Sequence, residues 1–160
     1  MTPQRFRFAP MNAAYAEAIA AWHYEGVYSF YDFEQDPEDK AELLDSAGWK
    51  GRYFAVLDEA EEIIGFFCFD LRGDTVEVGL GLRPDRTGKG LGRVFVQAGL
   101  AFARERFHPQ AFRIQVAEFN QRAIRVYERL GFRKEKKFLQ QTNGGEYEFV
   151  SMVREENEEE

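Results

Sequence analysis

The stretch VGLGLRPDRTGKGLGR, residues 78–93, joins a strand to a glycine-rich loop that opens directly into a helix. The first turn of a helix carries backbone N–H groups without partners inside the helix, at the positive end of the helix dipole. Such an end binds phosphate readily, and glycine at positions 88, 90 and 92 lets the backbone approach an anion. Three basic side chains can add charge there: Arg86, Lys89 and Arg93. The segment therefore predicts a phosphate-binding site.

Two familiar phosphate loops do not fit this segment. No Gly-Lys-Ser/Thr ending is present, so it is not a Walker A loop. Arg93 stands where the last glycine of a G-x-G-x-x-G dinucleotide fingerprint would follow Gly88 and Gly90. A glycine-rich turn before a helix can also do no more than cap that helix. On this segment alone, a simple capping loop remains the alternative.

A second segment, VAEFNQRAIRVYERLGF at residues 116–132, predicts a strand followed by a short amphipathic helix. Asn120, Ala123 and Tyr127 fall on one face of that helix by their spacing. Asn120 suits a helix N-cap, and Tyr127 suits a core aromatic with its hydroxyl at the surface. Taken in isolation, these are the simpler interpretations of the two residues.

The rest of the chain alternates between helix and strand signals. Asn12 and the Asp36-Pro37 pair are helix-start signals, and glycine-containing turns are expected at 72–74 and 142–145. Helices are expected over residues 12–22, 36–44, 90–107 and 120–130. Strands are expected over residues 5–9, 52–57, 63–71, 75–82, 112–117, 132–141 and 146–153. This order predicts a mixed α/β domain.

Burial patterns add detail to three of these elements. The helix at 90–107 has apolar residues at helical spacing, which predicts one buried face: Leu91, Val94, Phe95, Ala98 and Phe102. Residues 63–71 are nearly all apolar, which is typical of a strand buried on both faces. Glu77 alternates with Val76 and Val78, so we expect it on the opposite face of its strand.

The amino-acid composition limits the classes of protein to which the chain can belong. With 160 residues, 44% of them hydrophobic and 31% charged, the chain fits one soluble globular domain. Its net charge of -7 indicates no basic surface for binding nucleic acid. The same charge suits a cationic substrate. Residues 154–160, REENEEE, supply four of these seven net negative charges, so we expect an acidic disordered tail there.

The cysteine and histidine residues and the hydropathy of the chain indicate which disulfides, metal sites and cellular compartment to expect. Cys68 is the only cysteine, which excludes an intrachain disulfide, and its apolar strand predicts a core position. His23 and His108 lack the spacing of metal ligands, so we expect no metal site. The chain start has no signal-peptide core, and the run at 63–69 is too short to span a bilayer. We expect a cytoplasmic protein with no membrane association.

Taken together, segments 76–93 and 116–132 resemble the two acetyl-CoA-binding motifs of the GNAT superfamily of N-acetyltransferases. The phrases TGKGLG and FNQRAIRVYERLGF both match the style of this family, and the resemblance covers most of residues 4–153. It implies a central twisted mixed sheet of about seven strands flanked by about four helices. It also implies a single domain at residues 1–153, with the acidic tail at 154–160.

The resemblance implies that acetyl-CoA is the cosubstrate. The pantetheine arm would lie against the backbone of Leu80, Gly81 and Leu82, with Asn120 facing it. The diphosphate would sit on the backbone amides of Thr87, Gly88, Lys89, Gly90, Leu91, Gly92 and Arg93. The family usually has Gln or Arg where this chain has Thr87, so a phosphate contact by that side chain stays open.

The resemblance further implies direct attack of an amine on the thioester. Tyr127 would point at the sulfur and supply a proton or a hydrogen bond to the departing thiolate. A lysine-like amine has a pKa of about 10.4, so a base must take its proton, directly or through water. We assign Glu77 as this base; a solvent-facing strand residue and a water chain without one essential base are the alternatives. Weaker candidates for the base are Glu25, Asp70 and Glu118.

The segment WHYEGVYSFYDF, residues 22–33, lies between the first two expected helices. The resemblance implies that this region lines the acceptor site, and aromatic faces with carboxylates suit a cationic amine. Helix packing beside a solvated acidic turn is the alternative. We expect four residues here to contact the acceptor: Tyr24, Glu25, Tyr28 and Tyr31.

The leading hypothesis is therefore acetyl transfer from acetyl-CoA to a primary amine of a small molecule or peptide. A CoA-binding sensor without turnover, and nucleotide binding at the glycine loop, are the alternatives. Tyr127 favours the enzyme, because CoA binding alone needs no acid at the sulfur. The sequence leaves the acceptor and the oligomeric state open, and it is compatible with a homodimer.

Overall fold

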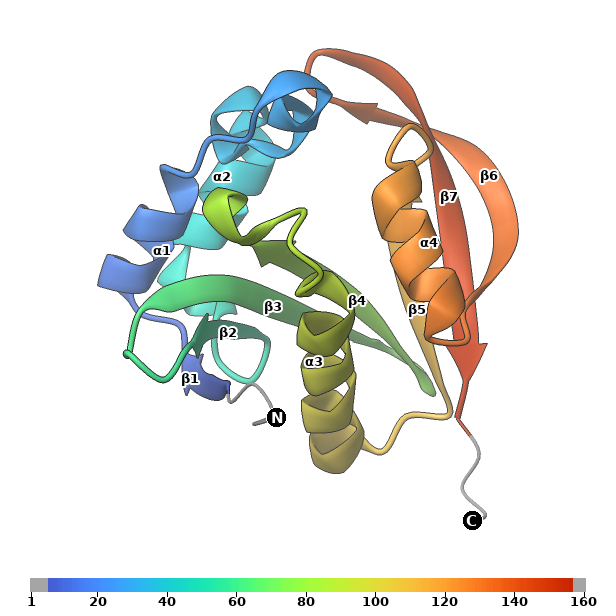
Figure 1. The fold of residues 1–160 in the computed structure, drawn as a ribbon, viewed down its shortest axis with the longest axis horizontal. Helices are drawn as coiled ribbons and strands as arrows, with labels where there is room; N and C mark the ends of the chain where they lie inside the picture. The colour runs from blue at the N-terminus through green and yellow to red at the C-terminus, as the bar shows by residue number, and fades with distance from the viewer. Residues whose placement is uncertain (1–5, 157–160) are drawn as a thin grey trace. The chain divides into compact units, whose positions relative to one another are not determined.

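The computed structural model describes residues 6–156, which contain seven strands and four α-helices (Figure 1). The strands form one mixed sheet in the order β1-β2-β3-β4-β5-β7-β6, with β4 parallel to β5. The strands are β1 (Arg7–Pro10), β2 (Tyr53–Leu57), β3 (Ile63–Arg72), β4 (Thr75–Leu82), β5 (Ala111–Ala117), β6 (Arg133–Thr142) and β7 (Gly145–Glu155). The α-helices are α1 (Ala13–Ala20), α2 (Pro37–Leu44), α3 (Gly92–Phe107) and α4 (Gln121–Arg129). The predicted fold class and order of strands and α-helices are confirmed.

The chain divides into two compact units. The first comprises the described residues up to 68 together with 80–91, and the second comprises 69–79 with the described residues from 92 onward. Strands β3 and β4 each pass from one unit into the other. Arg5, where the first strand was expected to begin, and residues 157–160 of the expected tail lie outside the described residues.

The first unit packs α1 and α2, which lie side by side (Figure 1), against β2. Asn12 caps α1 by accepting a hydrogen bond from the Tyr15 N–H at 2.8 Å. Asp36 caps α2, whose first residue is Pro37. Both predicted helix starts are confirmed. Their buried residues form one core with those of β2 and β3: Met11, Ala16, Ile19, Ala20, Leu43, Tyr53, Ala55 and Phe66.

Short 3₁₀-helices occupy stretches to which the sequence assigned no element. They are η1 (Gly26–Tyr31), η2 (Phe33–Gln35), η3 (Ser46–Gly48) and η4 (Pro84–Arg86). The connection between α1 and α2 is thus largely folded into η1 and η2. Helices of one or two turns are too short to show a periodic apolar pattern, so the sequence could not reveal them.

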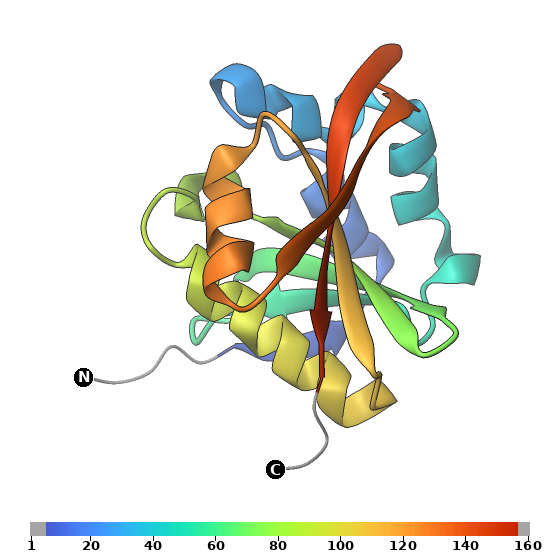
Figure 2. The same ribbon diagram turned by 90° about the vertical axis from the view of Figure 1, so that its right-hand side faces the viewer.

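The second unit contains β5, β7 and β6 together with α3 and α4. Strand β7 pairs antiparallel with both β5 and β6. The long, twisted β6–β7 hairpin in Figure 2 turns at Asn143 and Gly144, with φ angles of 52° and 78°. Two successive positive φ angles are typical of a type I′ turn, for which Asn-Gly is a preferred sequence. The predicted hairpin is confirmed.

Helix α3 differs from the prediction in its start and in its buried face. It begins at Gly92, two residues later than expected, and Val94 on the predicted face is 40% exposed. The buried residues are Phe95, Val96, Gly99, Leu100 and Ala103. The helix carries apolar residues on more than one side, so its periodicity does not decide which side packs.

The end of β7 also corrects a prediction. The strand continues to Glu155, so no disordered tail begins at Arg154. Arg154 lies in register with Phe112 of β5, and its Nη1 donates a hydrogen bond to the Leu130 carbonyl at 3.1 Å. The Glu156 carboxylate pairs with Arg154 at 2.7 Å. Within the acidic run, alternate residues face opposite sides of the chain. Arg154 and Glu156 face the second unit and are partly buried, whereas Glu155 is exposed.

Candidate acetyl-transfer site

The loop at residues 83–91 takes its shape from η4 and from two glycines. The Thr87 hydroxyl donates to the Pro84 carbonyl at 2.8 Å, and the Thr87 N–H donates to the same oxygen at 3.3 Å. Gly88 and Gly90 have φ angles of 71° and 75°, which residues with a side chain rarely adopt. Residues 88–90 are exposed. The predicted role of the Thr87 amide as a free phosphate donor is corrected, because that amide is bonded within the loop.

Arg86 anchors this loop instead of facing an anion. Its Nη2 donates to Oδ2 of Asp58, in the β2–β3 turn, at 3.1 Å. Asp58 also accepts the Glu62 N–H at 3.0 Å, and this backbone bond, with help from the Arg86 guanidinium, lowers the pKa of Asp58. Lys89 and Arg93 are exposed. These two residues therefore provide the positive charge that the segment can offer to a ligand.

The end of β4 packs on aromatic rings. A Cβ built on Gly81 would clash with Cε1 of Phe66, approaching it more closely than real side chains do. The Phe66 ring contacts Trp22 and Phe33, with ring centroids 6.4 and 5.7 Å away. Glycine is therefore required at position 81 by the close approach of a ring. The predicted acceptor segment at 22–33 contributes two of the rings that pack around it.

Tyr24 joins the acceptor segment to β4 directly. Its hydroxyl donates a hydrogen bond to the Leu82 carbonyl at 2.7 Å. Burial, followed by the nearby charge of Asp32, raises the pKa of Tyr24 far above its ordinary value. The hydroxyl consequently remains a donor at any physiological pH. A residue predicted to contact the acceptor thus bonds to a residue predicted to contact the cofactor.

Asp32 organises the same segment and was not predicted. It is 7% exposed, and its Oδ1 accepts the Tyr24 N–H at 2.8 Å. Its Oδ2 lies 3.1 Å from Nδ1 of His23. A buried carboxylate with two donors holds the backbone and one side chain of the segment in place. No sequence spacing could reveal these contacts, because they depend on how η1 folds.

The other predicted acceptor residues lie on or beside η1. Glu25 is exposed and precedes the first residue of η1. Tyr28 and Tyr31 are half-buried. The Tyr31 ring packs edge-on against Phe30, with centroids 5.3 Å apart. These three residues give the segment its aromatic and acidic character, while Tyr24 provides its contact with β4.

The second unit holds the remaining predicted residues on α4. Asn120 caps this helix through its side-chain oxygen, as the simpler interpretation predicted. Tyr127 is 6% exposed, and its ring packs against Phe132 with centroids 6.1 Å apart. A Cβ built on Gly92 would lie 3.8 Å from Cγ2 of Val126. Within the second unit, the start of α3 therefore lies close to the residue that precedes Tyr127.

Glu77, the predicted base, lies in the part of β4 that belongs to the second unit. Its side chain is 26% exposed, on the face opposite the buried Val76 and Val78, as predicted. Its Oε1 lies 3.6 Å from Nε of Arg72, and its Oε2 accepts from Nε2 of Gln115 at 3.4 Å. Both carboxylate oxygens thus have partners on neighbouring strands.

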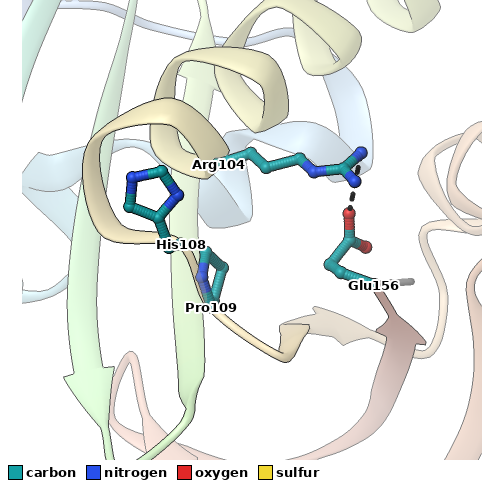
Figure 3. A pocket seen from close by; sticks show the side chains of 4 residues that line it. All are labelled: Arg104, His108, Pro109 and Glu156. Atoms are coloured by element: carbon teal, nitrogen blue, oxygen red, sulfur yellow. Dashed lines mark ion pairs between the residues drawn. The ribbon is translucent and has the colours of Figure 1, made fainter. Parts of the chain in front are cut away.

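A shallow hollow in the second unit lies at the C-terminal end of α3 (Figure 3). It is lined by Arg104, His108, Pro109 and Glu156. Arg104 and Glu156 form an ion pair across it at 3.7 Å. The hollow lies roughly 24 Å along the 16-residue helix from Gly92, the first residue of α3. None of its four lining residues is a predicted site residue.

Within residues 6–156, no group of three or more His, Cys, Asp or Glu side chains is arranged to hold a metal ion. None of the helices in this range combines the length and the hydrophobicity that a membrane-spanning helix needs. Cys68 is half-buried against the core of the first unit, and its Sγ lies 3.7 Å from Nη2 of Arg52.

Comparison with known sequences identifies relatives. A family profile described as "Acetyltransferase (GNAT) domain" matches residues 5–133. A mycothiol acetyltransferase of Salinispora tropica is 29% identical over 123 residues, which cover 73% of this chain and 38% of the relative. A mycothiol acetyltransferase of Propionibacterium freudenreichii is 35% identical over 82 residues, which cover 47% of this chain and 25% of the relative. The chain thus matches well under half the length of these relatives.

Comparison with solved structures shows the same fold. A chimera of the spermidine N-acetyltransferase of Vibrio cholerae has a TM-score of 0.77 at 19% identity, covering 94% of this chain and 95% of that one. The V. cholerae spermidine N-acetyltransferase in complex with CoA and spermine has a TM-score of 0.73 at 18% identity, covering 92% and 94%. A GNAT-family acetyltransferase of Bacillus anthracis has a TM-score of 0.73 at 16% identity, covering 97% of both chains.

Proposed function

Because this chain belongs to the GNAT family of acetyltransferases, we propose that it transfers the acetyl group of acetyl-CoA to a primary amine. The amine, on a small molecule or peptide, would attack the thioester directly in a ternary complex. One observation carries the proposal: the Tyr24 hydroxyl, from the acceptor segment, bonds to the Leu82 carbonyl at the end of the cofactor strand. This bond supports a site in which acceptor and cofactor meet at the end of β4.

The chain's own residues suit the two polar parts of acetyl-CoA, which supplies an activated acetyl thioester when bound. Amides from Gly88 to Arg93 lie at the start of α3, where the helix dipole favours a diphosphate. Lys89 and Arg93 would add charge. The backbone of residues 80–82 would pair with the pantetheine amides, and the Leu82 carbonyl can still accept a second hydrogen bond beside that from Tyr24. Asn120 would face the same arm.

Two side chains would handle protons. Tyr127 would donate to the departing sulfur, since a phenol is both a hydrogen-bond donor and a proton source. Glu77 would accept the proton of the amine. Because its oxygens already bond to Arg72 and Gln115, we propose that it acts through a bridging water.

The acceptor would be a cationic amine. The acidic chain, with a net charge of -7, attracts cations rather than anions. The names of its relatives point to small molecules: mycothiol in the sequence relatives, and spermidine in the structural ones. In this chain, Glu25 and the aromatic residues Tyr24, Tyr28 and Tyr31 would surround the ammonium group.

An acceptor screen tests the proposal. Thiol release from acetyl-CoA is measured with a panel of polyamines, amino acids, aminoglycosides, lysine peptides and peptides with free N-termini. We expect at least one amine to give release well above the amine-free rate. CoA binding without turnover on any amine would instead favour a sensor. Thermal stabilisation by ATP but not by CoA would favour a nucleotide site.

Replacing Tyr127 by Phe tests the proposed acid. Tyr127→Phe keeps the ring that packs on Phe132 and removes only the hydroxyl. We expect kcat to fall by about 10²-fold or more, the usual contribution of general acid catalysis. The Kd for CoA, measured by calorimetry, should stay nearly unchanged. Tyr147→Phe, at an exposed tyrosine of β7, is the matched control. Equal losses of turnover and CoA affinity in Tyr127→Phe would remove the acid role.

A further inference from the structure

We propose that His23, oriented by the buried carboxylate of Asp32, takes the proton from the ammonium form of the acceptor. This inference rests on the proposed acetyl transfer and replaces one part of it, the water-mediated proton transfer to Glu77, with direct proton transfer to His23. His23 lies in the acceptor segment, one residue before Tyr24. It belongs to neither of the two proposed acetyl-CoA-binding motifs.

The hydrogen bond between the two side chains fixes the tautomer of the imidazole. Nδ1 of His23 lies 3.1 Å from Oδ2 of Asp32. A carboxylate offers only acceptors, so Nδ1 must carry the hydrogen of this bond. The lone pair of the neutral ring is then on Nε2. This is the tautomer in which an Asp-oriented histidine serves as a general base.

Burial separates the roles of the two partners. Asp32 is 7% exposed, whereas the His23 side chain is 67% exposed. The Lys40–Glu34 pair nearby joins two accessible side chains instead, 36% and 48% exposed. An immobile carboxylate beneath an accessible imidazole fixes the ring while leaving Nε2 open to a solute. Among the residues that the structure describes, none forms a hydrogen bond with Nε2.

The same carboxylate ties His23 to the end of β4. Asp32 accepts the Tyr24 N–H at 2.8 Å, and the Tyr24 hydroxyl reaches the Leu82 carbonyl at 2.7 Å. His23 is therefore one residue, about 3.8 Å of backbone, from a side chain bonded to the proposed thioester strand. Of the two titratable residues that this network joins to His23, Asp32 orients the ring, and burial keeps the pKa of Tyr24 too high for it to act as a base.

The proposed step balances its protons and electrons. Nε2 of His23 takes one proton from the ammonium group and later releases it to water. The freed lone pair forms the N–C bond to the acetyl carbon, and the C–S bond breaks with its electron pair on sulfur. The second proton of the nitrogen is lost as the amide forms. It replaces the proton that Tyr127 gives to the thiolate.

Glu77 offers a clear contrast as proton acceptor. Its two oxygens are engaged by Arg72 and Gln115. His23 presents an uncommitted lone pair within the acceptor segment itself. If His23 is the acceptor, Glu77→Gln should lower kcat far less than His23→Ala. The opposite order would overturn the inference.

The decisive experiment is chemical rescue in the full chain. We expect His23→Ala to lower kcat with the best amine by about 10²-fold or more, with an unchanged Kd for CoA. Added imidazole should restore part of this loss, which a purely structural role would not allow. His23→Gln, whose amide can still donate to Asp32, should retain the fold and show the same loss. His108→Asn is the control at the other histidine, where φ is 50° and asparagine is tolerated.

Two results would overturn the inference: turnover of His23→Ala and His23→Gln within about twofold of wild type, or a loss that imidazole does not restore. The wild-type assay separates this failure from that of the proposed function. If the wild-type chain releases no thiol with any amine, acetyl transfer itself is wrong. If it does and the His23 variants match it, only the role of His23 is wrong.

Discussion

The glycine loop at residues 83–91 and the acceptor segment at 22–33 belong to the same unit, yet different kinds of contact hold them. Near neighbours shape most of the loop: Thr87 bonds to Pro84, and Arg83 pairs with Asp85 at 2.7 Å. One distant contact, from Arg86 to Asp58 at 3.1 Å, anchors it. Distant residues hold the segment: the bond from Tyr24 to Leu82 joins positions 58 residues apart. Its internal order depends on Asp32, whose carboxylate is buried.

This difference separates cofactor recognition from acceptor recognition. A diphosphate needs only free amides and positive charge, which a short run of residues can supply. An amine acceptor needs oriented side chains on a surface assembled from several elements. We therefore expect single changes in the loop to act on CoA affinity, and single changes in the segment to act on turnover or stability.

The largest effect should come from Gly90, where φ is 75° and residues with a side chain are strained. Gly90→Asp adds this strain and places a negative charge where the diphosphate should bind. We expect the Kd for CoA to rise by about 100-fold or more, each tenfold costing about 1.4 kcal/mol. Isothermal titration measures this change directly.

Gly144 is a matched control for Gly90. Its φ is 78°, and a Cβ at either glycine would meet no atom within 4 Å. Gly144→Asp should lower the free energy of unfolding by about 1–2 kcal/mol, the usual cost of a left-handed residue, and leave CoA affinity alone. If the two variants bind CoA equally well, the glycine loop is not the phosphate site.

A smaller effect is expected at Gly81, beside the rings of the acceptor segment. Gly81→Ala forces the buried Phe66 ring to move, so we expect a loss of about 1–3 kcal/mol in the free energy of unfolding. Urea titration measures it, and Gly48→Ala, whose new Cβ would lie 3.5 Å from Nη1 of Arg52, is the control. In a double-mutant cycle, Phe66→Leu should recover part of the loss. Additive effects would mean that the ring is not the cause.

Local signals made most of the fold predictable from the sequence. Asn12 and the Asp36-Pro37 pair mark the helix starts that the structure has, and Asn143-Gly144 marks the hairpin turn. The errors arose where packing against other elements determines which residues are buried. Helix α3 buries Val96 in place of Val94, because apolar residues on several sides leave the choice to its neighbours.

The features of the candidate site that depend on nearby residues were easier to predict than those that depend on distant contacts. The positive φ angles of Gly88 and Gly90 agree with a sequence-based argument about glycine. The roles of Asp32 and Arg86 were missed, because each depends on a partner that η1 or the β2–β3 turn brings near. An acidic residue in an acidic segment gives no sign that it alone will be buried.

The smallest effect is expected at Asp58, which anchors the glycine loop through its hydrogen bond with Arg86. The Glu62 N–H, and next the Arg86 guanidinium, lower the pKa of Asp58 below its ordinary 3.8. A carboxyl whose pKa falls on folding contributes stability that is complete above its unfolded pKa and is lost as the pH drops through the folded pKa. We expect Asp58→Asn to cost about 1 kcal/mol or less at pH 7, since Arg86 is 30% exposed.

Urea titrations of wild type and Asp58→Asn at pH 7 and at roughly pH 3 test this sign, because protonation of the wild-type carboxyl should narrow the difference at the acid end. A difference that is equal at both pH values would exclude the charge of Asp58 as its source. The Kd for CoA should change less than in Gly90→Asp, because the glycines, and not the Asp58–Arg86 pair, expose the amides. An equally large loss of affinity would show that the loop depends on a distant contact after all, as the acceptor segment does.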